Sequence, residues 1–169
     1  MKVLHIGVAN DFRRIGLIRD PHNFGTTTVA SADTRRQLYA TIFSSVSGTF
    51  TADEEINQAT TGAVGKVVEY DSTNKILYWY QTRFPDVGTD TNGNLTAFSG
   101  ANAITGQSSS AAATPNTSNS NTVNGVVFSS GYSSPELAFD SGDIIYVEER
   151  SPITRASDQT ENIKLIVEF

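Results

Sequence analysis

Apolar and polar residues alternate in short runs along most of this chain, which is the pattern of β-strands. The clearest region is residues 48–81, where three predicted strands are separated by two turns. The strands cover residues 54–58, 65–70 and 75–81, and the turns are Ala59-Thr60-Thr61-Gly62 and Asp71-Ser72-Thr73-Asn74. Asp and Asn between two β-rich runs favour a hairpin, because their side chains bond to nearby backbone. We therefore predict a β-meander here.

Further extended segments are predicted on both sides of this meander. Before it, they are residues 3–8, 15–18, which stops at Pro21, and 26–29. After it, they are residues 126–128, 137–139 and 143–148, and a last apolar strand at 163–169. We expect the last strand to be tied into a sheet, because a loose apolar strand would expose an edge that aggregates.

Residues 34–46 fit two patterns. As a helix, Asp33 would cap it and Leu38 would share a face with Ile42. As a strand, residues 38, 40, 42 and 46 would line one side, and the segment is rich in β-branched and aromatic residues. We favour the strand.

Residues 91–135 contain no charged residue, and residues 106–125 are almost entirely Ser, Ala, Asn, Thr and Gly. So little apolar surface does not offset the backbone entropy of about 1–2 kcal/mol per ordered residue. We predict a long low-complexity loop at about residues 84–125. The chain is then a single mainly β domain over residues 1–169, an antiparallel β-sandwich or meander sheets with little helix.

Composition removes several classes of function. The net charge is −6 and Lys and Arg are scattered, so we expect no nucleic-acid partner. No apolar run approaches the ~20 residues that span a bilayer, and the N-terminal residues lack the apolar core of a signal peptide, so we expect no membrane partner. The absence of cysteine removes disulfides, thiolate nucleophiles and Cys-based zinc sites.

Candidate catalytic or metal-binding groups are few. His5 and His22 fit no ligand spacing and are interpreted as surface or strand histidines. Adjacent carboxylates on a strand point to opposite faces, so neither pair converges on one substrate atom; these pairs are Glu54 with Glu55 and Glu148 with Glu149. We therefore predict no catalytic, cofactor-binding or metal site, no cofactor, and no enzyme.

Two polar or aromatic groups keep a binding interpretation open. Asp86, Asp90 and Asn92 resemble part of a calcium loop, but their spacing misses the usual pattern and no bidentate Glu follows. The run Tyr78-Trp79-Tyr80 could stack on a sugar or a base, although packing in the core explains it as well.

Two separated motifs resemble the baseplate wedge protein of T4-like contractile-tailed bacteriophages, the product of gene eight. They are residues 11–21, DFRRIGLIRDP, and residues 141–155, SGDIIYVEERSPITR, which lead through 156–161 to the last strand. Residues 48–55 and 59–63 resemble, less specifically, a β-module of phage structural proteins. Members of this family are longer at the N-terminus, so the chain resembles a C-terminal portion or a truncated relative.

This resemblance implies a mainly β virion structural protein without an active site. It implies a homodimer that scaffolds other baseplate wedge proteins, located in the phage tail baseplate and in the host cytoplasm during virus assembly. The alternative that the residues suggest is a carbohydrate- or receptor-binding β-domain of a phage tail.

Overall fold

The computed structural model describes residues 14–31, 36–81, 88–138 and 141–149. They contain eleven β-strands and, within these ranges, no helix. The mainly β prediction is confirmed. The chain divides into two compact units, residues 21–141 and a second unit built from residues 1–20 and 142–169. The prediction of a single domain is not tested by this division and stays a prediction.

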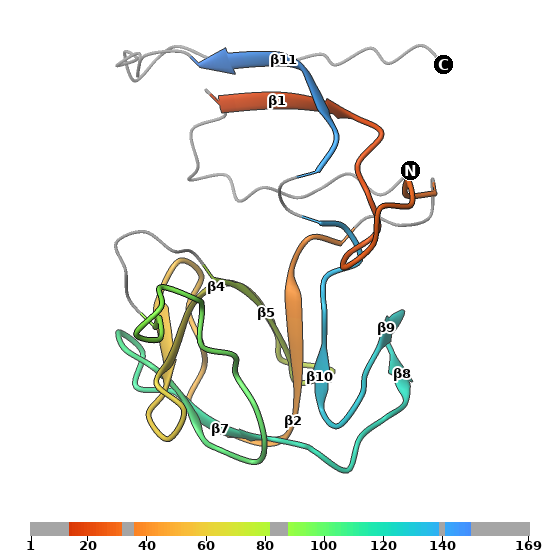
Figure 1. Cartoon of the computed structure of the whole chain (residues 1–169). Coiled ribbons are helices and arrows are strands. Elements are labelled where there is room, and N and C mark those ends of the chain that lie inside the picture. The colour runs from red at the N-terminus through yellow and green to blue at the C-terminus, as the bar shows by residue number, and fades with distance from the viewer. Residues whose placement is uncertain (1–13, 32–35, 82–87, 139–140, 150–169) are drawn as a thin grey trace, which may run out of the picture. The chain divides into compact units, whose positions relative to one another are not determined.

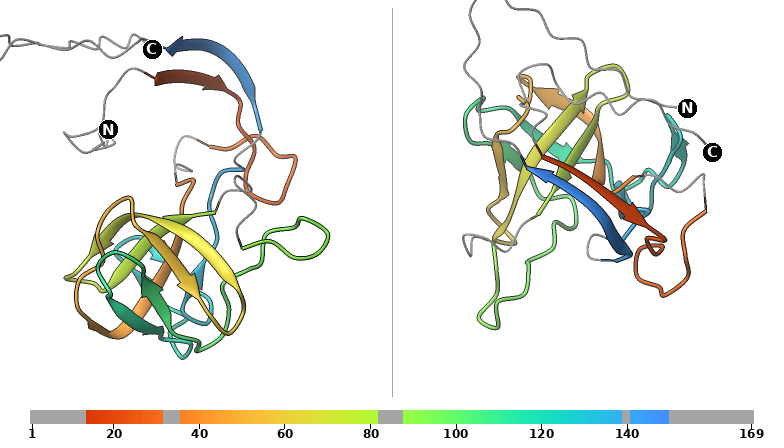
Figure 2. Two further views of the ribbon diagram at one scale, coloured as in Figure 1. Left: turned by 90° about the vertical axis from the view of Figure 1, so that its left-hand side faces the viewer. Right: turned by 90° about the horizontal axis from the view of Figure 1, so that it is seen from above.

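Six strands of the larger unit close into a barrel-like antiparallel sheet, which we call the barrel (Figure 1 and Figure 2). Their order is β2-β5-β4-β3-β6-β7, and β7 pairs again with β2. Closure matters because it removes the open strand edges through which sheets pair with other chains. The strands are β2 (Tyr39–Ser47), β3 (Glu55–Gln58), β4 (Ala63–Asp71), β5 (Ile76–Tyr80), β6 (Ile104–Gly106) and β7 (Ala112–Pro115).

The predicted meander is confirmed as β3, β4 and β5. The turn between β4 and β5 is held by Asp71, whose Oδ1 accepts hydrogen bonds from the backbone N–H groups of Thr73 and Asn74, both at 3.0 Å. The backbone of Lys75 takes a positive φ of 56° at the end of this turn. Short polar side chains thus build the hairpin in the way that the sequence indicated.

Strand β2 is a strand, as favoured over the helix, and its length allows barrel closure. Its first half, Tyr39 to Ile42, pairs with β5, and its second half pairs with β7. The register with β7 shifts between Phe43 and Val46. Such an irregularity bends a strand, so one long strand can serve two neighbours in a closed sheet.

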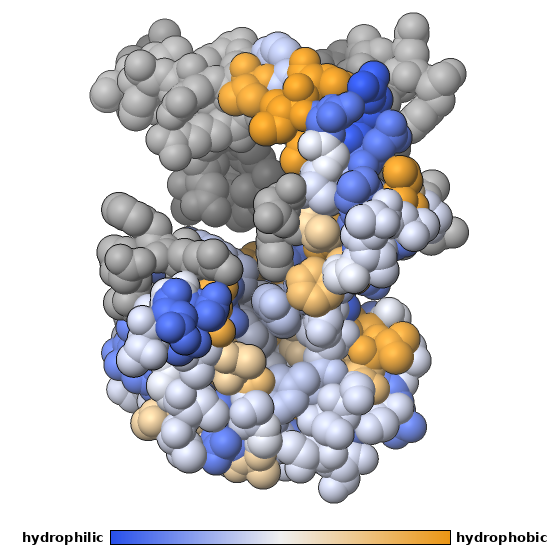
Figure 3. All heavy atoms as spheres, in the orientation of Figure 1, coloured by the Kyte–Doolittle hydropathy of each residue, from blue (hydrophilic) through white to orange (hydrophobic). Residues whose placement is uncertain are grey.

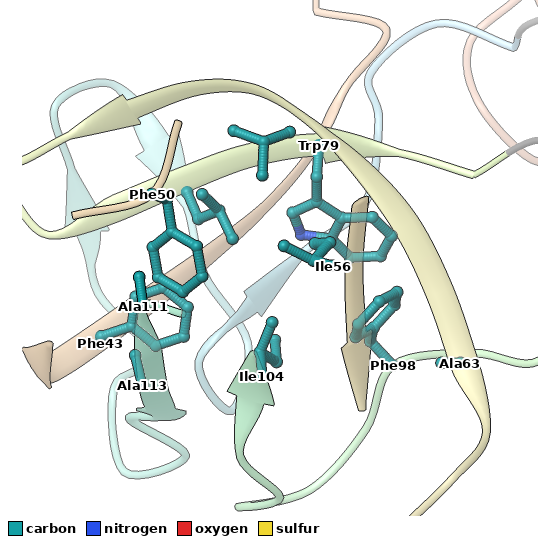
Figure 4. Packing of buried hydrophobic residues seen from close by; sticks show 11 residues of the cluster. Phe43, Phe50, Ile56, Ala63, Trp79, Phe98, Ile104, Ala111 and Ala113 are labelled. Carbon is teal, nitrogen blue, oxygen red and sulfur yellow. The ribbon is translucent and has the colours of Figure 1, made fainter. Parts of the chain in front are cut away.

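The core of the barrel is aromatic, and Figure 4 shows how its rings meet. Phe43 and Phe50 stack with centroids 5.9 Å apart, and Trp79 lies 4.4 Å from Phe98. A second cluster packs Ile42 and Ile76 against Phe128. The buried apolar residues with known exposure all lie between Ala40 and Phe128, within the larger unit.

The predicted loop at residues 84–125 is where the structure departs most from the sequence-based expectation. This stretch contributes β6, β7 and the short strand β8 (Thr122–Val123), and it buries Ile104, Ala111 and Ala113. The burial comes from neighbours elsewhere in the chain: a Cβ atom at Gly48 would lie 3.2 Å from the Cα of Ala111. Small side chains allow this close approach, so they can pack in the core. The prediction of a loop, which was made from composition alone, was therefore wrong for these strands.

Other strand predictions had mixed outcomes. Residues 126–128 form β9 (Val126–Val127), which pairs with β8. Residues 26–29 and 137–138 form isolated bridges rather than strands, His22 with Val29 and Asn23 with Leu137, and there the strand predictions were wrong. A further short strand, β10 (Tyr132–Ser133), pairs with β2. Residues 3–8, 139 and 163–169 lie outside the described residues.

Candidate functional site

The smaller unit contains an antiparallel pair of strands, β1 (Arg14–Arg19) and β11 (Asp143–Glu149), which we call the ribbon. Both strands were predicted, at residues 15–18 and 143–148. Leu17 lies opposite Tyr146, and Ile18 lies opposite Ile144. The register shifts between Leu17 and Ile18 because Ile145 is an extra residue on β11. One end of the ribbon is fastened by Arg19, whose guanidinium Nη2 lies 2.8 Å from the Asp143 carboxylate.

Both faces of the ribbon expose apolar side chains. Successive residues of a strand point to opposite faces, so Leu17 and Ile18 lie on different faces, each with its partner on β11. Figure 3 shows hydrophobic atoms gathered over this part of the chain. The exposed fractions are Leu17 52%, Ile18 45%, Ile144 69%, Ile145 58%, Tyr146 47% and Val147 64%.

This exposure is unusual for a surface that only meets water. Scattered apolar residues on a surface are normal, but a contiguous group usually marks a contact with another molecule. Isolated two-stranded hairpins are also marginally stable in water. The ribbon is therefore the candidate functional site, because its exposed apolar side chains are suited to contact with another element.

The predicted candidate residues for catalysis do not converge among the described residues. Glu54 is buried at 5% exposure, whereas its neighbour Glu55 is exposed, as expected for adjacent residues. The backbone N–H of His22 donates a hydrogen bond to the Ser141 Oγ at 2.8 Å. His5, and the side chains of Glu148 and Glu149, lie outside what the structure describes.

The buried carboxylate of Glu54 accepts four hydrogen bonds. Its carboxylate accepts hydrogen bonds from the backbone N–H groups of Thr51 at 2.7 Å, Ser109 at 2.9 Å and Ser108 at 3.2 Å, and from the Ser109 hydroxyl at 2.8 Å. Burial raises the pKa of Glu54, but these hydrogen bonds, led by those from Ser109 and Thr51, outweigh it and leave the pKa below its usual value. The carboxylate thus anchors residues 108–109 beside β3.

The acidic residues considered for calcium also serve the local backbone. The carboxylate of Asp90 accepts hydrogen bonds from the N–H groups of Asn92 at 2.8 Å and Asn94 at 2.9 Å. These hydrogen bonds lower the pKa of Asp90 below its usual value, and the bond from the Asn94 N–H has the largest effect. Asp86 lies outside the described residues, within which no group of three His, Asp or Glu side chains is placed to hold a metal ion.

Trp79 is unavailable for stacking on a ligand. It is 2% exposed, and its ring stacks on that of Tyr39 with the centroids 4.6 Å apart. The ring of Phe98 lies against it at a tilt of 54°, with the centroids 4.4 Å apart. Its indole N–H donates to the Thr41 hydroxyl at 2.9 Å. The interpretation of Trp79 as a core residue is confirmed, and the carbohydrate-binding alternative loses one of the three aromatic residues that motivated it, while Tyr78 and Tyr80 are partly buried.

A cavity of about 340 Å³ lies beside this aromatic stack. Its walls include Tyr39, Trp79, Phe98 and Tyr132, and the rings of Trp79 and Tyr39 already stack on each other. The Tyr132 hydroxyl is also engaged, since it donates to the Gly100 carbonyl at 2.8 Å.

A polar cluster around Arg36 was not predicted from the sequence. Its guanidinium donates to the carbonyls of Leu38 and Ser134 and to the Ser133 hydroxyl, and its backbone N–H donates to the Glu136 carboxylate at 3.0 Å. Burial lowers the pKa of Arg36, and Glu136 opposes this effect. The cluster joins segments about 100 residues apart, so no spacing in the sequence could have revealed it.

The fold combines a barrel-like antiparallel sheet with a strand pair that exposes apolar side chains, and the comparison with protein families adds the class of protein. The family model of bacteriophage T4 Gp8 matches residues 84–169, half of the chain. The chain belongs to this family of phage tail baseplate proteins, which places it in the virion as a structural protein. The matched range contains the motif at residues 141–155 and strand β11, whereas the motif at residues 11–21 lies outside it.

No curated protein and no solved structure matches the chain. Among the described residues, no helix is long and apolar enough to span a bilayer.

Proposed function

We propose that this protein is a non-enzymatic subunit of the baseplate wedge that scaffolds neighbouring baseplate proteins, associates as a homodimer, and assembles in the host cytoplasm. The observation that carries the proposal is the family match over residues 84–169, because this range includes β11 and its exposed apolar side chains. Family membership indicates where the protein acts, which is the phage tail baseplate. The ribbon has the exposed apolar surface that binding to a neighbouring protein would bury.

The physical basis is the contrast between the two units. The six strands of the barrel pair with one another, so they offer no long edge to a neighbour. The ribbon has the opposite character, since its strands have only each other as partners among the described residues and its apolar side chains face outward. Burial of apolar surface contributes roughly 25 cal/mol per Å², so docking of this surface favours association.

Two matched substitutions test the proposal. Val147 in the ribbon and Val127 on β9 are exposed to similar extents, 64% and 68%. Sedimentation and binding to purified tail proteins are measured for Val147→Asp and Val127→Asp. We expect Val147→Asp to weaken self-association and partner binding at least about tenfold, because a buried unpaired carboxylate is costly. Val127→Asp is expected to leave both unchanged.

A native chain that remains a strict monomer, and that binds no tail protein, would refute the scaffold function. A Val147→Asp variant that associates and binds tail proteins as the native chain does would instead show that the ribbon is not the surface involved.

A further inference from the structure

Two Asn-Gly pairs of this chain lie in turns of the larger unit, Asn92-Gly93 and Asn124-Gly125. Both pairs are exposed, and a Cβ atom at either glycine would meet nothing within 4 Å. An asparagine followed by glycine loses its side-chain amide more readily than other asparagines, because glycine has no side chain to hinder its backbone nitrogen. The local structure then decides which of the two pairs reacts.

The turn at Asn92 is closed by hydrogen bonds to Asp90. The Gly93 N–H donates to the Asp90 carbonyl at 3.0 Å, and the Asp90 N–H donates to the Asn94 carbonyl at 2.8 Å. The Asp90 carboxylate also accepts hydrogen bonds from the N–H groups of Asn92 and Asn94. The nitrogen that would attack the Asn92 amide is thus engaged, and the backbone on both sides of it is fixed.

The turn at Asn124 is held more loosely. It joins β8 to β9, which have two residues each and form a sheet of their own (Figure 1). The Gly125 N–H donates to no acceptor in the described part of the chain. The Nδ2 of Asn124 donates to the Asp71 carboxylate at 3.3 Å, which is a long hydrogen bond. Because so short a hairpin opens easily, the Asn124 side chain can turn toward the Gly125 nitrogen.

We propose that Asn124 is a site of spontaneous deamidation in the folded protein. The Gly125 backbone nitrogen attacks the Cγ of Asn124 and forms an N–Cγ bond. The Cγ–Nδ2 bond breaks, and Nδ2 leaves as ammonia after taking up the proton of the Gly125 nitrogen. Water then opens the cyclic imide, and its attack at Cγ leaves aspartate at position 124, whereas its attack at the backbone carbonyl carbon leaves isoaspartate. Water is the only other reactant.

The product changes the hairpin because of what Asn124 contacts. Its amide donates to the Asp71 carboxylate, which also accepts a hydrogen bond from the Asn74 Nδ2 at 2.6 Å. A carboxylate at position 124 has no proton to donate and has the same charge as Asp71, so repulsion replaces a hydrogen bond. Isoaspartate also lengthens the backbone of this two-residue turn. Deamidation therefore loosens the hairpin, which contributes Val126 to the second core cluster. This proposal goes beyond the proposed function and does not depend on it.

Peptide mapping by mass spectrometry tests the proposal, because it separates asparagine, aspartate and isoaspartate at a given position. The folded chain is incubated in mildly alkaline buffer, and the rate at each asparagine is divided by its rate in the urea-unfolded chain, which removes the effect of local sequence. We expect this relative rate to be at least about fivefold higher at Asn124 than at Asn92, the factor that one hydrogen bond contributes. Asp90→Ala should raise the relative rate at Asn92 toward that at Asn124, because it removes the two bonds to the carboxylate.

A relative rate at Asn92 that equals or exceeds the rate at Asn124 would overturn the proposal. Its effect on the hairpin is measured with Asn124→Asp, and Asn92→Asp is the control because it adds the same charge in the other turn. We expect hydrogen exchange at residues 122–128 to become about fivefold faster in Asn124→Asp and to stay unchanged in Asn92→Asp. Equal exchange in the two variants would overturn the effect on the hairpin. Neither measurement depends on whether tail proteins bind the chain.

Discussion

At the scale of single residues, Glu54 gives the sharpest prediction, because its carboxylate is buried and accepts several hydrogen bonds. The substitution Glu54→Gln keeps the shape but sets an NH2 group against N–H donors of the backbone. We expect a loss of about 2–4 kcal/mol in the free energy of unfolding at pH 7, measured with urea. The exposed neighbour Glu55 is the control, and Glu55→Gln is expected to change the free energy by less than about 0.5 kcal/mol.

The same residue predicts a pH dependence. The pKa of Glu54 is lower in the folded chain than its usual value of 4.5. The unfolded chain therefore binds the proton more tightly, so the carboxylate stabilises the fold above pH 4.5 and this stabilisation is lost as the pH falls through the folded pKa. The difference between the native chain and Glu54→Gln should shrink below pH 4.5. A difference that stays constant down to pH 3 would contradict this account.

At the scale of elements, β6 decides whether the uncharged stretch is a strand of the barrel or a loop. Ile104 in β6 is fully buried against the aromatic core. Truncation by Ile104→Ala should therefore cost about 2–5 kcal/mol in the free energy of unfolding, since it leaves a cavity. Val127→Ala, at a residue 68% exposed, should cost less than about 0.5 kcal/mol. Equal, small effects of both would show that residues 84–125 are a loop after all.

The elements also show which features a sequence can reveal. The meander was predictable because Asp71 and its neighbours fix the hairpin through bonds within four residues. Strands β6 and β7 were not, because Ile104 and Ala113 are ordered by contacts with distant residues rather than by their own propensity. The same limit applies to the candidate site. Alternation predicted both strands of the ribbon, but only the structure shows that Leu17 and Val147 are exposed.

At the scale of the whole molecule, the open question is whether the two units fold as the single domain that the sequence predicts. The buried apolar residues with known exposure lie between Ala40 and Phe128, so the larger unit contains its own core. A buried polar side chain of this unit also finds its hydrogen-bond partners within the unit. Gln58, fully buried, donates to the Asn102 carbonyl at 2.8 Å and accepts from the Ser99 N–H at 2.9 Å.

From this we predict that a fragment of residues 21–141 folds without the ribbon. Trp79 is the chain's single tryptophan and is buried in the barrel, so its fluorescence reports folding of the fragment directly. We expect blue-shifted emission and a cooperative urea transition within about 1 kcal/mol of the full chain. A fragment that remains unfolded would place the ribbon inside one folding domain. A folded fragment that no longer associates with itself or with tail proteins would instead show that the barrel folds alone and that the ribbon is the surface needed for association.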